Sequence, residues 1–295
     1  MNHVFYRDWL GNFGDVLNEP FFNEVTPNLL VKKKQLSFYG IGSLLNNTFG
    51  EISNAVIFGS GIGHGDPPII DHNSVKIFGV RGPYSATSCK ISLSKVIGDP
   101  GLYLPKLNFY KRSISSQSGS VCLAPHHTTC EAWRIPYTDK FTLANSYDEI
   151  NKYIHLIASA KLVLAESLHA AILAAAFDVP FIPVRLNAKV NSIKWKDFYA
   201  SLEMNYESHH QLEIPLRRKR RSLSLVAGKQ YHRYFGSAIY KNSPFLNQNQ
   251  FDSLCDSIDE AISNIKPESV NRKVVNHLQS RTTIALENLN NYLND

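Results

Sequence analysis

The sequence has little of several features that define particular classes of protein. Its four cysteines include no CxxC pair, which excludes a dense disulfide framework and favours reduced thiols. No apolar run approaches the ~18 residues of a membrane-spanning helix, and the first residues carry no basic leader followed by an apolar segment. Low-complexity tracts are absent as well. We therefore expect a soluble, globular, cytoplasmic protein.

The charge of the chain is moderately basic, with a formal net charge of +6. Such a balance favours an anionic partner, which could be nucleic acid, a membrane surface or a phosphorylated small molecule. The basic run from Arg217 to Arg221 is either a solvated loop or a contact with anionic lipid headgroups. Because no aromatic residues interleave with it, we expect no nucleic-acid partner.

Short apolar runs alternate with helical patterns along most of the chain, which predicts two parallel-sheet α/β domains with a cleft between them. A serine-rich segment, 111–119, is the best candidate for a linker. We accordingly place Rossmann-like domains at 1–115 and 116–250, with two helices in 251–295 packing on them. The predicted strands are 3–6, 35–40, 54–58, 75–80, 121–124, 141–144, 161–165 and 179–184.

The segment 161–184 reads as a buried strand, a sharp turn, an alanine-rich helix and a second buried strand. The helix, 168–177, is apolar nearly all round apart from His169, which follows Ser167 in a good N-cap position. A strand that leads into a helix places its loop at the carboxyl edge of the sheet, where backbone N–H groups and the helix dipole favour anions. The segment therefore predicts an anion site.

Two glycine-containing loops follow predicted strands in the first half of the chain. In the first, Asn12 and Asp15 either make the turn and cap the next helix, or offer an amide and a carboxylate to a ligand. In the second, Gly59, Ser60 and Gly61 begin a run of four glycines in seven residues that suits a phosphate, a carboxylate or a tight crossing. Its spacing does not match GxGxxG, so we discount a dinucleotide site.

Charged side chains at two further strand ends complete the first half. Arg81 follows strand 75–80, where a guanidinium can hold a carboxylate or a phosphate in a two-pronged grip, or form a salt bridge. Asp99 has three possible roles: it could act as a helix cap, line a cleft or anchor Arg81. These alternatives stay open at the level of sequence.

In the second half, a helix over 146–158 is predicted from the capping-box spacing of Ser146 and Glu149. Another helix, 189–204, carries Lys194, whose side chain could face the same cleft as Arg185. Four potential zinc ligands also occur close together, at Cys122, His126, His127 and Cys130. Because Cys122 lies inside an apolar strand, we expect a buried thiol with loop histidines and no metal site.

The sequence resembles the polysaccharide pyruvyl transferase family over about 12–197. The resemblance rests on motifs at 11–15, 58–62, 80–83, 98–100, 167–175 and 179–180. It implies a two-domain fold like that of the B-type glycosyltransferases (GT-B), and transfer of the pyruvyl group of phosphoenolpyruvate to two sugar hydroxyls as a cyclic ketal. The bacterial exopolysaccharide subgroup is most similar, which implies an acceptor sugar on a lipid-linked repeat unit, no metal, and no cofactor beyond the donor.

The resemblance also suggests roles for individual residues. His169 would be the acid or phosphate partner. Asp15 would be the base or would orient the sugar hydroxyl, with Asp99 and Glu166 as alternatives to it. Acceptor-side contacts would come from Asn12, Asp99 and Glu166. Donor-binding residues would be Arg81, Ser167, Gly59, Ser60, Gly61 and Lys194.

One departure from the family pattern concerns the donor side of the site. Many members of the family carry an arginine where this chain has Ser167. A replacement cation is therefore expected, from Arg81, Arg185, Lys189 or Lys194.

Two other functions fit the same architecture. A glycosyltransferase that uses a nucleotide sugar would bind a nucleoside diphosphate. A non-catalytic assembly protein would dock at the inner face of the membrane through Arg217 to Arg221.

Overall fold

The computed structural model describes residues 2–4, 13–27, 29, 33, 35–63, 65–108, 119–186, 190–212 and 243–295, with no side-chain description for 2–4 and 49. Asn12, Lys189 and the basic run from Arg217 to Arg221 lie outside the described residues, as does most of the linker at 111–119. The predictions that concern them stay predictions.

The first sheet is parallel and has the strand order β1-β2-β3-β4. Its elements are β1 (Asn2–Val4), α1 (Phe13–Val25), β2 (Ser37–Tyr39), β3 (Ala55–Ser60), β4 (Lys76–Val80) and α2 (Pro83–Ser88). β3 is buried along its whole length, as expected for an apolar strand covered on both faces. α2 begins with Pro83 directly after the N-cap Gly82, as expected for a proline at the first helical position.

The second sheet is also parallel, with the order β6-β5-β7-β8-β9. Its elements are β5 (Val121–Ala124), α3 (His127–Ala132), β6 (Thr142–Leu143), α4 (Ile150–Ala158), β7 (Leu162–Ala165), α5 (Leu168–Ala176), β8 (Phe181–Arg185) and β9 (His210–Gln211). The strand, helix and strand predicted in 161–184 are confirmed. The expectation of an α/β protein with parallel sheets is therefore confirmed too.

The predicted start of the helix over 146–158 is wrong. α4 begins at Ile150 with Glu149 as its N-cap residue, and Ser146 lies in the preceding turn. The side chain of Asn145 accepts a hydrogen bond from the N–H of Tyr147, and the backbone N–H of Asn145 donates to the carboxylate of Asp148. These local bonds give the backbone an alternative to the helix, which explains the later start.

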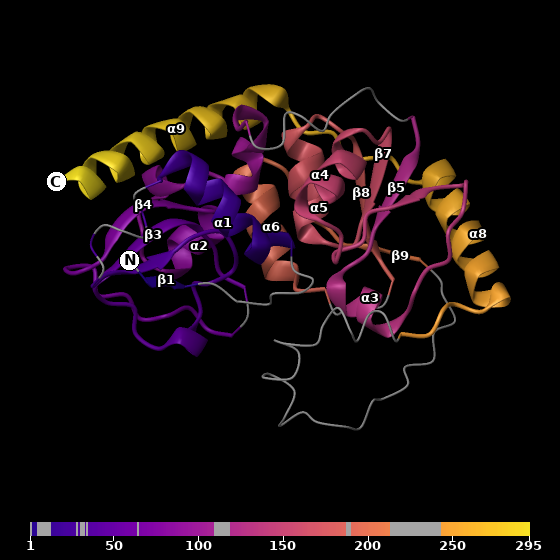
Figure 1. The fold of residues 1–295 in the computed structure, drawn as a ribbon, viewed down its shortest axis with the longest axis horizontal. Coiled ribbons are helices and arrows are strands. Elements are labelled where there is room, and N and C mark those ends of the chain that lie inside the picture. Colours follow the sequence, from indigo (N-terminus) through magenta and orange to yellow (C-terminus); the bar gives the residue numbers. More distant parts are fainter. Residues whose placement is uncertain are drawn as a thin grey trace.

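The C-terminal helices pack on different sheets (Figure 1). α8 (Gln248–Asn264) contributes to the core of the second sheet, whereas α9 (Arg272–Asn294) runs along the first. Arg272 at the start of α9 donates to the carbonyl of Ala175 in α5, at 3.0 Å. Farther along, Gln279 donates to the carbonyl of Leu102, at 2.8 Å. α9 therefore ties the end of α5 to the first half of the molecule.

The two sheets share one continuous hydrophobic core. α5 packs against the 3₁₀ helix η3 (Pro100–Lys106) of the first half. The approach is close, since a Cβ placed at Gly101 would lie 2.8 Å from Cγ2 of Ile172. The same cluster extends through Phe22 and Phe38 around the first sheet. A core of this kind couples the stability of the two halves.

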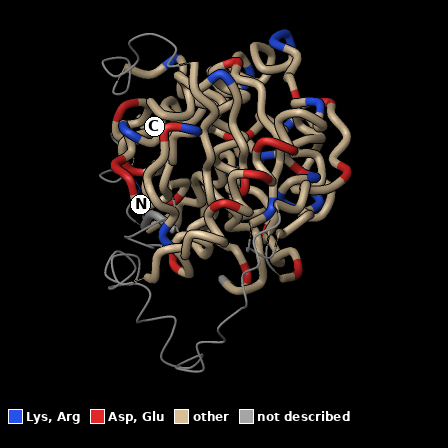
Figure 2. The backbone as a smooth tube through the Cα atoms, turned by 90° about the vertical axis from the view of Figure 1, so that its right-hand side faces the viewer, with Lys and Arg blue, Asp and Glu red and all other residues tan. Residues whose placement is uncertain are grey.

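Charged residues of both signs are interspersed over the described part of the chain, as Figure 2 shows. Among the helices in the described ranges, none combines the length and hydrophobicity that a bilayer crossing needs.

We predict that Ile172→Ala lowers the free energy of unfolding by about 2–4 kcal/mol, because Ile172 is 1% exposed at the contact between the two halves. The matched change Ile284→Ala on α9, where the side chain is 58% exposed, should cost less than about 0.5 kcal/mol. Chemical denaturation followed by circular dichroism measures both. Two separate transitions in the wild type, with only one shifted by Ile172→Ala, would contradict a shared core.

Candidate active site

His169 reaches from the second half of the molecule to the first. It lies in the first turn of α5, and its imidazole ring packs on Gly14 in the first turn of α1. A Cβ at position 14 would overlap the ring, so this approach requires glycine. Phe13 lies beside the imidazole, with 6.2 Å between ring centroids, and stacks on Tyr153 of α4. The carboxyl-edge loops of the two sheets therefore meet at His169.

The surroundings of His169 disfavour its protonation. Burial, together with the charges of Lys194, Arg81 and His127, lowers the pKa of His169 to about 3. The imidazole is therefore neutral near pH 7 without a ligand. The three basic groups come from different elements, α6 (Ser192–Ser201), the end of β4 and α3. Together with the N-terminus of α5, they make the site suited to an anion.

Lys194 extends from α6 to the loops of the first sheet. A Cβ at Gly63 would lie 2.7 Å from Cε of Lys194 and 2.5 Å from Cβ of Ser43, so the lysine stem lies against Gly63, in the neighbourhood of Ser43. Burial and the charge of Arg81 lower the pKa of Lys194 to about 8, against a smaller opposing effect of Asp15. Lys194 is therefore mostly in the ammonium form at pH 7, and it loses its proton as the pH rises through about 8.

Asp15 lies in the first turn of α1, beside the loop that follows β2. Its carboxylate is buried, and a Cβ at Gly42 would lie 3.7 Å from its Oδ1. Asn18 holds α1 to this loop, because its side chain donates to the carbonyl of Ile41 at 3.0 Å and accepts from the same residue's N–H at 2.8 Å. Asp15 thus lies on the first-sheet side of the same region as Lys194.

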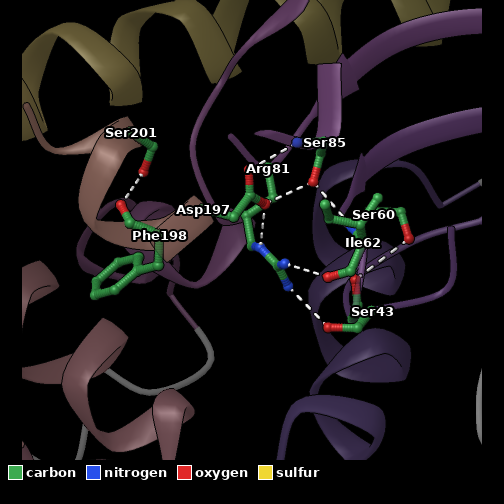
Figure 3. A network of polar contacts seen from close by, with 9 residues as sticks. Ser43, Ser60, Ile62, Arg81, Ser85, Asp197, Phe198 and Ser201 are labelled. Atoms are coloured by element: carbon green, nitrogen blue, oxygen red, sulfur yellow. Dashed lines mark hydrogen bonds and ion pairs between the residues drawn. The ribbon is translucent and has the colours of Figure 1, made fainter. Parts of the chain in front are cut away.

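Arg81 follows β4, as predicted, but its guanidinium group is bound by protein atoms (Figure 3). Nε donates to Oδ2 of Asp197 at 2.9 Å, Nη1 to Oγ of Ser43 at 2.9 Å, and Nη2 to the carbonyl of Ile62 at 2.6 Å. Arg81 is 1% exposed. The geometry favours an electrostatic effect on the site, and a direct grip on the donor stays a prediction.

Asp99 and Glu166 accept hydrogen bonds from the backbone of neighbouring loops. Asp99 is the N-cap of η3, where Oδ1 accepts from the N–H of Gly101 at 2.9 Å, so of its three possible roles the structure places it as a cap. Glu166 accepts from the N–H of His126 at 2.9 Å and from that of Leu186 at 2.8 Å. Both carboxylates are buried. Their contact with an acceptor stays a prediction.

The glycine loop after β3 is bonded mainly within the protein. Gly59 lies inside β3 with φ of +76°, where the register of the β3 and β4 pair shifts. Ser60 is also in the strand, with Oγ donating to the carbonyl of Gly42. The N–H of Gly61 donates to the carbonyl of Gly42 at 2.9 Å, and that of Ile62 to Oγ of Ser85 at 2.9 Å. Donor binding by this loop stays a prediction.

Ser167 is the N-cap residue of α5, as predicted, but its hydroxyl makes no capping hydrogen bond. Among the cations considered as replacements for the missing arginine, Arg185 is exposed and donates to Gln211 on the neighbouring strand β9. Lys194 alone combines partial exposure with electrostatic contact to His169 among the described candidates. The geometry therefore favours Lys194 for this role.

The cysteines near the two loop histidines are buried thiols. Burial raises the pKa of Cys122 to about 11 and that of Cys130 to about 12. His126 and His127 lie beside each other, with 4.1 Å between ring centroids. The described residues contain no group of three or more His, Cys, Asp or Glu side chains arranged to hold a metal ion.

Sequence reasoning missed three features of the site. Asp197 lies on the face of α6 that packs on α2 and pairs with Arg81. Because Asp197 is three residues after Lys194, the sequence could have indicated that the two side chains lie on the same face of the helix. The sequence suggests that Gly14 lets the backbone approach a ligand, whereas in the structure the imidazole of His169 packs on it. Asn18, which holds α1 in place, carries no signal in the sequence.

These observations define an α/β protein with an electropositive site where the loops of two parallel sheets meet. A family model described as polysaccharide pyruvyl transferase matches residues 13–187, and the chain belongs to this family. The chain is similar to the succinoglycan biosynthesis protein ExoV of Rhizobium meliloti (strain 1021), with 31% identity over 222 residues. The match covers 70% of this chain and 66% of that protein, slightly less than two thirds of its length.

We predict that Asp99→Asn stabilises the protein at neutral pH. Burial raises the pKa of Asp99 to about 6, so ionisation of this carboxyl costs folding free energy as the pH rises from about 4 through 6. Asparagine keeps an acceptor for the N–H of Gly101 and carries no charge. Relative to wild type, the variant should gain on the order of 2 kcal/mol between pH 4.5 and pH 7.5. Urea unfolding at both pH values measures this, and a relative loss over that range would contradict it.

Proposed function

We propose that the protein transfers the pyruvyl group of phosphoenolpyruvate to two hydroxyls of a sugar, which forms a cyclic ketal in a bacterial exopolysaccharide or its lipid-linked repeat unit. Membership of the polysaccharide pyruvyl transferase family supports pyruvyl transfer. The observation that carries the choice of donor is the convergence of Lys194, Arg81 and His127 on the neutral imidazole of His169, at the N-terminus of α5. Phosphoenolpyruvate carries a phosphate and a carboxylate, and both suit such a site.

The proposed architecture is that of two Rossmann-like domains with an inter-domain cleft, as in the GT-B fold. The division of the strands into two parallel sheets supports it. In this arrangement the donor lies between α5 of the second half and the loops of the first. Lys194 and the first N–H groups of α5 bind the phosphate, with Ser167 beside them. Arg81, whose guanidinium group packs on Gly61, contributes its charge to the site.

His169 is the proposed acid. Without a ligand its imidazole is neutral, because all the charged groups that act on it are basic. A bound phosphate adds negative charge and raises the pKa of His169, so the donor itself brings about protonation. The imidazolium then donates its proton to the methylene carbon of the donor, and positive charge develops at C2.

Asp15 is the proposed base, supported by its place beside Lys194 and the loop that follows β2. One sugar hydroxyl attacks C2 and gives up its proton to this carboxylate. The bond between C2 and the phosphate oxygen breaks and phosphate leaves. The second hydroxyl then attacks C2 to close the ketal ring and gives its proton to the imidazole of His169, which the first step left neutral. Asn12, Asp99 and Glu166 are proposed to shape the acceptor side. The reaction as written needs no cofactor or metal.

The acceptor would place the enzyme in the cytoplasm, at or near the inner face of the membrane. A lipid-linked sugar lies at that surface, and the basic run from Arg217 to Arg221 has the charge to contact anionic headgroups. Similarity to a succinoglycan biosynthesis protein supports a polysaccharide acceptor.

We predict that His169→Ala lowers kcat/KM for ketal formation by about 10²–10⁴, since general acid catalysis contributes an effect of this size. Asp15→Asn should have an effect of similar size for the same reason. The matched control is His277→Ala, because His277 is exposed on α9 and should leave activity unchanged. Phosphate release and mass spectrometry of the sugar product measure the reaction in folded protein. Full activity of His169→Ala would remove the central role proposed for the imidazole.

We predict that Lys194→Met weakens binding of the donor by about 10–100-fold, because the loss of one charge-assisted hydrogen bond has an effect of this size. Lys196→Met is the matched control, because Lys196 is exposed on the same helix. Thermal shifts with phosphoenolpyruvate measure binding, and shifts with uridine diphosphate test a nucleotide-sugar transferase. Stabilisation by the nucleotide alone would favour that second function.

Proton uptake tests the coupling between the donor and His169. The pKa of His169 is about 3 without ligand, and the bound phosphate should raise it above about 6. Binding at pH 6 should then take up at least about half a proton more in wild type than in His169→Gln. Calorimetry in two buffers of different ionisation enthalpy measures the proton uptake of each protein. Protons that the ligand itself gains or loses contribute equally to both proteins and cancel in the difference. Equal uptake by both proteins would contradict it.

A further inference from the structure

The carboxylate of Asp197 is completely buried between two parts of the chain that are far apart in sequence. Asp197 belongs to α6, after the last long strand of the second sheet, yet the partners of its carboxylate lie in the first half (Figure 3). Oδ1 accepts from the N–H of Ser85 at 2.8 Å, and Oδ2 accepts from Oγ of Ser85 at 2.5 Å and from Nε of Arg81 at 2.9 Å. The pair with Arg81 therefore joins the two halves.

The first half is shaped to receive this carboxylate. Ser85 is the third residue of α2, so Asp197 caps the N-terminus of α2 from another helix, where a negative charge is favoured. Gly82 precedes α2, and a Cβ at this position would overlap both the carbonyl and the carboxylate of Asp197. A residue with a side chain at 82 would therefore push α6 away from α2.

The same helix carries Lys194, one turn before Asp197 and on the same face. Asn191, the N-cap of α6, donates from its side chain to the carbonyl of Gly63 at 2.8 Å. Lys194 thus lies between two anchors on the first half, and its stem packs on Gly63. α6 lies beyond the residues 13–187 that match the family model.

We propose that Asp197 is a positioning residue, which anchors α6 to Arg81 and Ser85 and thereby holds the Lys194 ammonium at the site of an anionic ligand. The proposal depends on the proposed function for the identity of that ligand, phosphoenolpyruvate. The placement of Lys194 by Asp197 depends on geometry alone.

The titration of Lys194 distinguishes positioning from a general contribution to stability. In place, Lys194 is partly buried, lies near Arg81 and Asp15, and has a pKa of about 8. If α6 moves out, the ammonium becomes hydrated and its pKa rises toward the ordinary value of about 10.4. Loss of the Asp197 charge alone would act in the opposite direction, because the site would become more positive. The direction of the shift therefore shows which effect operates.

The experiment measures the pH dependence of acetylation of individual lysines by acetic anhydride, with mass spectrometry, in the full-length folded protein. We expect Asp197→Asn to raise the pKa of Lys194 by at least one unit relative to wild type, while Ser201→Ala leaves it unchanged. Ser201 is on the same helix, and its hydroxyl donates to the carbonyl of Phe198 and not to the first half. The exposed Lys196 serves as the internal standard in every variant. An unchanged or lowered pKa of Lys194 in folded Asp197→Asn overturns the proposal.

Gly82→Ala provides a second route to the same test, because it separates α6 from α2 while both charges remain. Gly82→Ala should also raise the pKa of Lys194. If Asp197→Asn does not fold, an unchanged pKa of Lys194 in folded Gly82→Ala overturns the proposal. Affinity for phosphoenolpyruvate at pH 7 should fall at least tenfold in Asp197→Asn, as in Lys194→Met. If the wild type does not bind this ligand, the proposed function fails, whereas the lysine titration still decides whether Asp197 positions Lys194.

Discussion

The ion pair of Arg81 and Asp197 connects the two halves of the molecule at the place where their loops meet. Burial of two charges is tolerated only where each has well-placed partners, and here Ser43, Ser85 and the carbonyl of Ile62 provide them. Such an arrangement leaves little freedom for α6. The position of Lys194 and the electrostatics of the site both follow from it.

The charged groups that act on His169 are all basic, although Arg81 is paired with Asp197 and Asp15 acts on Lys194. Since Lys194, Arg81 and His127 all oppose protonation of His169, the imidazole is neutral until an anion arrives. A site of this kind can couple binding of a phosphate to the presence of a catalytic proton. The same groups, if they lay at a solvated surface, would be screened and would have little effect on one another. Burial between two sheets is thus what gives these residues their proposed chemistry.

The architecture could be predicted largely from sequence, because short apolar strands and an alanine-rich helix have strong local signals. The segment 161–184 folds as its pattern indicates, and Pro83 begins α2 as expected. The start of α4 was misplaced, because the side-chain bonds of Asn145 outweigh a capping-box spacing. Arg81 follows β4 and Asp99 precedes η3, but the sequence could not decide between ligand contact, cap and anchor for these side chains.

The sequence by itself determined the two parallel sheets, the helix start at Ser167 and His169, and the family, because these depend on local periodicity and ordered motifs. Only the tertiary structure decided that Arg81 pairs with Asp197, that Gly14 seats the imidazole and that Lys194 lies beside Ser43. Each of these contacts joins residues far apart in the chain, so no local pattern encodes it. The physical reason is that burial and pairing, and not residue type, determine whether a charged side chain anchors the fold or faces a ligand.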